Sequence, residues 1–69
     1  MAISYNKLWK LLIDKRMKRI YLKKMASLST TTLAKLGKEE VVSMEVMQRI
    51  CKVLNCDIGD VMEFEPDEE

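Results

Sequence analysis

The residues with the most informative chemistry lie between Thr30 and Lys38, in the stretch TTTLAKLGK. If this stretch is a helix, successive side chains are about 100° apart, and its polar and small residues share one face. That face would hold Thr30, Thr31, Ala34, Lys35 and Lys38, with Leu33 and Leu36 on the opposite side. Threonine hydroxyls, a lysine and a small methyl group suit the base edges of a DNA major groove. A short amphipathic surface helix with a solvated polar face would give the same pattern.

A turn and a preceding helix would position this face. Ser29 is predicted to cap the second helix, with Leu28 and Leu33 in apolar contact across its start. Gly37 is predicted to end that helix in a left-handed conformation.

The preceding helix is predicted to run from about Arg19 to Ala26, with Leu22, Met25 and Ala26 facing inward. Lys23 and Lys24 would then face water or a phosphate group. No capping residue type precedes this helix, so its first N–H groups would lie open beside Lys18 and Arg19. Water or an anion could satisfy these groups.

Charge is distributed very unevenly along the chain, although the formal net charge is only +1. Residues 1–38 contain ten lysines and arginines and a single acid, Asp14, which gives a charge of +9. Residues 39–69 contain Arg49 and Lys52 against ten acids, which gives −8. A strongly basic side suits a polyanionic partner. The alternative is that the two halves simply attract each other on folding.

The size and composition exclude several functional classes. A chain of 69 residues buries only roughly 60% of its unfolded surface, which leaves little room for a deep catalytic cleft. There is no histidine, no paired carboxylate beside a nucleophile and no glycine-rich phosphate loop, so we expect no enzyme. Cys51 and Cys56 are expected to be reduced thiols, and no metal, cofactor or small-molecule site is evident.

The sequence also gives an expectation of where the protein resides. No apolar run reaches the roughly 18 residues that a membrane span needs. The start, MAISYNKLWK, lacks the basic-then-apolar order of a signal peptide, so we expect a cytoplasmic protein that does not enter a membrane.

Three further helices complete the predicted architecture, which is all-α. The first is capped by Ser4 and carries an apolar stripe of Tyr5, Leu8, Trp9, Leu12 and Ile13. The fourth is capped by Ser43 and buries Met44, Met47, Ile50, Cys51 and Leu54. Asp57 opens a fifth helix of a single turn, with Asp60 in a capping box and Val61, Met62 and Phe64 completing the core. No β alternation is visible, and residues 65–69 form an acidic tail that we expect to be loose.

Five short helices with this central motif resemble the Cro/CI-type (Xre family) helix-turn-helix DNA-binding domain. The resemblance is carried by three segments over residues 3–64, namely LKKMASLS followed by TLAKL, the Val42-Ser43 start of the fourth helix, and LNCDIGDV. The closing stretch LNCDIGDVMEF is similar to a compact bacterial subgroup. The resemblance implies a compact, lambda-repressor-like bundle of five short helices, whose second and third helices form the helix-turn-helix.

The resemblance also implies roles for individual residues. The third helix would lie in the major groove of double-stranded DNA, where Thr30, Thr31 and Lys35 match base-contacting positions. Ser29 and Arg19 match positions near phosphates, and charge and geometry add Lys18, Lys23, Lys24 and Lys38 to that group. The family forms homodimers on DNA and binds near-palindromic half-sites about one helical turn apart.

Three departures from the family pattern stand out. Ser27 occupies a turn position usually held by glycine, Arg19 replaces a common glutamine, and Glu39 and Glu40 bring negative charge next to the third helix. The function expected is a sequence-specific DNA-binding transcriptional regulator of bacterial or phage type. The alternative is a protein-interaction module that keeps the fold without specific DNA binding.

Overall fold

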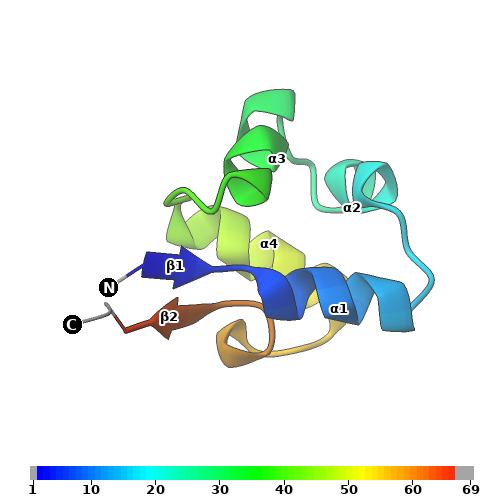
Figure 1. The fold of residues 1–69 in the computed structure, drawn as a ribbon. Helices are drawn as coiled ribbons and strands as arrows, with labels where there is room; N and C mark the ends of the chain where they lie inside the picture. Colours follow the sequence, from blue (N-terminus) through cyan, green and yellow to red (C-terminus); the bar gives the residue numbers. More distant parts are fainter. Residues whose placement is uncertain (1, 67–69) are drawn as a thin grey trace.

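A computed structural model describes residues 2–66 of the chain, and within them four helices pack around one core. The elements in chain order are β1 (Ala2–Ser4), α1 (Asn6–Asp14), α2 (Arg19–Met25), α3 (Thr30–Gly37), α4 (Met44–Leu54), the 3₁₀ turn η1 (Ile58–Asp60) and β2 (Glu63–Glu65). Helices α2 and α3 lie together on one side of the molecule, and the two strands lie at the end opposite the α1–α2 connection (Figure 1). No helix in the described range is long and apolar enough to cross a membrane.

The two strands form a small antiparallel sheet, which corrects the prediction of an all-α protein. Ala2 lies opposite Glu65, Ile3 opposite Phe64 and Ser4 opposite Glu63. Strands of three residues are too short to show an alternating pattern, and their pairing joins the two ends of the chain. The acidic tail predicted over residues 65–69 therefore begins inside a strand at Glu65, and residues 67–69 lie outside the described part.

The start of α1 also differs from the prediction. Ser4 belongs to β1 and is fully buried, and its Oγ accepts a hydrogen bond from the Asn6 N–H at 3.3 Å. The N-cap position is held by Tyr5, which forms no side-chain capping bond. Instead, the buried Tyr5 hydroxyl donates to the Glu40 carbonyl at 2.8 Å. This bond ties the first helix to the connection between α3 and α4.

A single hydrophobic core joins all four helices and η1. Its buried members are Tyr5, Leu8, Leu12, Leu22, Ala26, Leu28, Leu36, Met47, Ile50, Leu54 and Val61. Four apolar residues predicted to be inward are instead exposed, namely Ile13, Met25, Met44 and Phe64. Ile13, Met25 and Met44 lie at the ends of helices, and Phe64 lies in β2.

Each of the four helices is followed within two residues by a residue in the left-handed backbone region, and none of these residues is glycine. The φ angles are 54° at Arg16, 55° at Ser27, 59° at Glu39 and 53° at Asn55. The predicted left-handed stop at Gly37 is wrong, because Gly37 is the last residue of α3 and the stop falls on Glu39. The predicted fifth helix is the 3₁₀ turn η1, and its capping box between Asp57 and Asp60 is confirmed.

Candidate nucleic-acid interface

The turn between α2 and α3 sets the orientation of the two helices. Ser27 takes the left-handed conformation, and the Leu28 N–H then donates back to the Lys23 carbonyl at 2.9 Å. Ser29 caps α3 as predicted, because its Oγ accepts from the Thr32 N–H at 3.0 Å. The Ser29 hydroxyl also donates to Thr32 Oγ1 at 2.9 Å. The start of α3 is therefore fixed before any partner binds.

The apolar and the polar residues of α3 lie on opposite faces of the helix, as the sequence predicts. Leu36 is fully buried and Leu33 partly buried, and together they anchor the helix on the core. The residues on the opposite face are all exposed, and they are Thr30, Thr31, Ala34, Lys35 and Lys38. A helix packed this way offers a continuous polar and cationic face to solvent.

A contact between α2 and α3 was not foreseen from the sequence. The Lys23 ammonium group donates to Thr30 Oγ1 at 2.9 Å. Lys23 therefore places a positive charge at the first turn of α3 and holds the Thr30 hydroxyl in one orientation. The two residues are seven positions apart, so helical spacing within one element gives no signal for this contact.

Arg19 has a second role beside that of a surface cation. Its guanidinium carbon lies 3.8 Å from the centroid of the Trp9 ring, which is a cation–π contact between α2 and α1. Arg19 also lies next to Gly37, the last residue of α3. If Gly37 carried a Cβ, that atom would be 3.8 Å from a guanidinium nitrogen of Arg19. Arg19 thus bridges three helices while remaining exposed. Trp9 is partly buried against the core, in agreement with its predicted place on the apolar stripe of the first helix.

The remaining predicted phosphate contacts are exposed cations. Within residues 2–66 the ion pairs are Lys7–Glu63 and Glu45–Arg49, and neither involves Lys18, Lys24, Lys35 or Lys38. Ser29, Thr30 and Lys23 meet at the α2–α3 junction, whereas Lys18 lies before α2 and Lys38 follows α3. Glu39 and Glu40 are exposed directly after α3. They add negative charge at one end of an otherwise basic surface.

The two cysteines are free thiols, and they lie outside this surface. Burial, followed by the proximity of Cys56, raises the pKa of Cys51 to about 11. No group of three or more histidine, cysteine or acidic residues in the described part of the chain is arranged to hold a metal ion.

Comparison with known proteins gives a family match and similar individual proteins. The family model described as the Cro/C1-type HTH DNA-binding domain matches residues 7–67. A curated Bacillus subtilis (strain 168) protein, the uncharacterized HTH-type transcriptional regulator YozG, is 38% identical over 45 residues. That match covers 65% of this chain and 50% of YozG, so the alignment spans about half the length of this relative.

A solved structure is also very similar to the fold. The crystal structure of the transcriptional regulator VanUg superposes with a TM-score of 0.92 at 53% sequence identity. The superposition covers 96% of this chain and 88% of the VanUg chain. The capped α2–turn–α3 unit, the exposed face of α3 and the family match over most of the sequence all agree. The chain belongs to the Cro/C1-type helix-turn-helix DNA-binding family.

Proposed function

We propose that the protein is a transcriptional regulator that binds double-stranded DNA sequence-specifically, with α3 in the major groove. The observation that carries this proposal is the exposed face of α3, which is held rigidly by the Ser29 cap and by buried Leu36. Helices of this kind enter the major groove with their first turns against base edges. YozG and VanUg, both described as transcriptional regulators, support the regulatory role.

In this arrangement one set of residues contacts DNA bases and a second set contacts DNA phosphates. Thr30, Thr31 and Lys35 contact bases, and Thr31 and Lys35 lie one helical turn apart on the same exposed face. Lys18, Arg19, Lys23, Lys24, Ser29 and Lys38 contact phosphates. The Lys23–Thr30 bond refines this assignment, because loss of Lys23 would free the Thr30 hydroxyl as well as remove a charge.

The proposal includes a homodimer on DNA. One copy of α3 spans few base pairs, and two copies related by a twofold axis would bind half-sites about one helical turn apart. The site is then expected to be near-palindromic. Sedimentation of the protein with and without a selected duplex would give the number of chains bound.

Selection from a pool of random duplexes tests sequence specificity. Wild type should enrich one motif, and Lys35→Ala should select a motif relaxed at particular positions, with a loss of about 1–3 kcal/mol on the wild-type site. The matched control is Lys10→Ala, which removes one exposed cation from α1. Lys10 follows Lys7 by three residues on α1, and the Lys7 ammonium donates to the carbonyl of Gly59 in η1.

The outcomes separate two functions. If Lys35→Ala selects the same motif as wild type, α3 does not lie in the groove as assigned. If wild type enriches no motif at all, the protein-interaction module on the same fold becomes the better explanation.

A further inference from the structure

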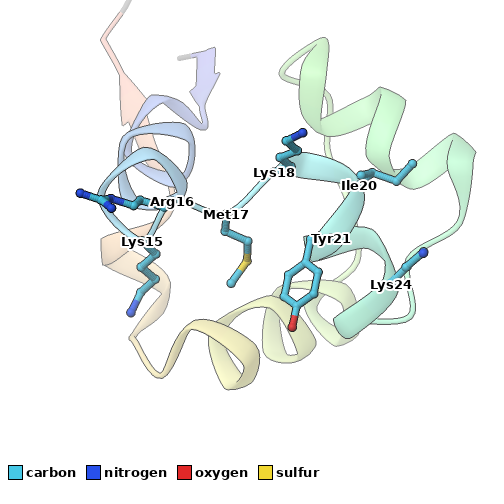
Figure 2. A pocket seen from close by; sticks show the side chains of 7 residues that line it. All are labelled: Lys15, Arg16, Met17, Lys18, Ile20, Tyr21 and Lys24. Carbon is cyan, nitrogen blue, oxygen red and sulfur yellow. The ribbon is translucent and has the colours of Figure 1, made fainter.

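A hollow lies where α1 ends and α2 begins, and the proposed DNA contacts leave most of it unused. It has a volume of about 430 Å³, within the roughly 300–1,000 Å³ typical of small-molecule sites. Met17, Ile20 and Tyr21 form its apolar part, as Figure 2 shows. Ile20 is 60% exposed and Tyr21 is 50% exposed. In Figure 2 the Tyr21 ring lies beside the Met17 side chain, and the Ile20 side chain points away from both. We call this feature the α1–α2 hollow.

Four cations also line the hollow, and Figure 2 shows that the Arg16 and Lys18 side chains point away from Met17 and Tyr21. The four cations are Lys15, Arg16, Lys18 and Lys24, and no acidic side chain lines the hollow. Within residues 2–66, none of the four takes part in an ion pair. Arg16 is held at this place by the end of α1, where it takes a φ of 54° while its N–H donates to the Ile13 carbonyl. An anion bound in the hollow would therefore meet a lining whose charged groups are all positive.

The composition of the hollow limits its occupant. A DNA phosphate would neutralise the cations but would leave Met17, Ile20 and Tyr21 in water, because phosphates carry no apolar surface. An uncharged apolar molecule would cover those side chains and leave the four positive charges unpaired. A molecule with both parts satisfies both sets. We propose that the α1–α2 hollow binds a small organic anion with an aromatic or aliphatic body.

Binding at this site would oppose DNA binding, and this step rests on the proposed function. Lys18 and Lys24 line the hollow and are also assigned to phosphate contacts. A bound anion neutralises these lysines and adds negative charge beside the DNA backbone. Because the coupling between two ligands is reciprocal, DNA should weaken anion binding by the same factor. The hollow would then act as an effector site.

A pair of fluorescent probes tests the site without any DNA. The anionic probe is 8-anilinonaphthalene-1-sulfonate, and the uncharged probe of similar shape is N-phenyl-1-naphthylamine. Wild type should bind the anionic probe more tightly. Arg16→Asn and Lys24→Gln should each weaken that binding by about tenfold, the loss of one charge-assisted contact. Asparagine tolerates the left-handed conformation at position 16, so the fold should be kept.

Matched controls lie elsewhere on the surface. Lys52→Gln removes an exposed cation from α4, and Phe64→Ser removes an exposed aromatic ring from β2. Both variants should bind the anionic probe as wild type does. Equal affinity for the two probes, or unchanged affinity in both Arg16→Asn and Lys24→Gln, would overturn the proposal. So would loss of probe binding in Phe64→Ser.

A second measurement separates this inference from the proposed function. The anionic probe is added to the protein on its selected duplex, and DNA affinity should fall as the probe saturates the hollow. If the probe binds the free protein but leaves DNA affinity unchanged, the effector role fails while the site stands. If the protein selects no DNA sequence, the proposed function fails, and the probe titration still decides the site.

Discussion

At the level of single residues, the ends of the helices separate what local sequence predicts from what it misses. Ser27 stands where glycine is common, and its φ of 55° confirms that this turn needs the left-handed region. Gly37 was expected to play that role for α3, but the Glu39 and Glu40 N–H groups close the helix two residues later. Position 27 therefore has a left-handed backbone that favours glycine but holds serine. Position 37 lies in a helix, which disfavours glycine, but holds glycine.

This mismatch predicts two stabilising substitutions. Ser27→Gly should raise the free energy of unfolding by about 1 kcal/mol, because a side chain in the left-handed region is strained. Gly37→Ala should also stabilise, by up to about 1 kcal/mol, because alanine favours a helix and the added methyl would meet Arg19 only at ordinary contact distance. Urea unfolding measures both, with Thr31→Gly as the control that should destabilise. A less stable Ser27→Gly protein would show that the serine hydroxyl makes a necessary contact.

Cys51 gives a prediction about pH. The unfolded chain begins to release this proton near the ordinary thiol pKa of 9.0, whereas burial raises the pKa of folded Cys51 to about 11. The folded state therefore holds the proton to higher pH. The stability linked to this group is complete below pH 9.0 and is lost as pH rises toward 11. Cys51→Ala should lose less stability than wild type across this window in urea titrations. Identical losses would contradict the raised pKa.

At the level of the elements, many features that depend on near neighbours in the chain were predictable, although the Ser4 cap and the Gly37 stop were not among them. Ser29, Ser43 and Asp57 each bond an N–H within the next three residues, and all three caps are present. The division of α3 into a buried and an exposed face follows from the helical repeat in the same way. Most of the candidate interface therefore follows from local rules.

The features that depend on distant contacts were not predictable. The strands pair residues more than 58 positions apart, and the Arg19–Trp9 contact joins two helices. A helical repeat shows that Met25 and Met44 lie on the flank of an apolar stripe but not whether another element covers that flank. Both are exposed, at 53% and 64%. Packing between elements decides such cases.

The two serine caps predict contrasting effects. Ser29→Ala and Ser43→Ala each remove one capping bond, so each should lower the free energy of unfolding by about 1 kcal/mol. Ser29 is also assigned to a phosphate contact, so its loss should weaken binding to all duplexes about equally. Ser43→Ala should leave DNA affinity unchanged. Fluorescence anisotropy at matched folded fractions measures this difference, and equal affinities for the two variants would remove Ser29 from the interface.

At the level of the whole molecule, the uneven charge along the chain is distributed unevenly over the elements. The assigned cations belong to α2, α3 and the residues next to them, whereas Asp60 belongs to η1 and Glu63 to β2. Attraction between the halves, the alternative considered from the sequence, accounts for the Lys7–Glu63 pair. The cations around α3 are not used in this way within the described residues.

The basic side predicts a strong dependence of DNA affinity on salt. The five cations assigned to phosphates would contribute about −5 per bound chain to the slope of the logarithm of affinity against the logarithm of salt concentration. Lys38→Ala should reduce the magnitude of this slope by about one without changing the selected motif. Titrations at several salt concentrations measure both. A flat response would mean that the basic side serves another partner.

The small sheet has a consequence for how the backbone could be connected. Because Ala2 lies opposite Glu65, the two ends of the described chain are already side by side, far from the α1–α2 hollow. A short linker between them would close the protein into a ring with little distortion. Ring closure would lower the conformational entropy of the unfolded chain. Folding would then lose less entropy when the two strands pair. The same adjacency suits circular permutation, in which new termini open elsewhere while α3 keeps its place.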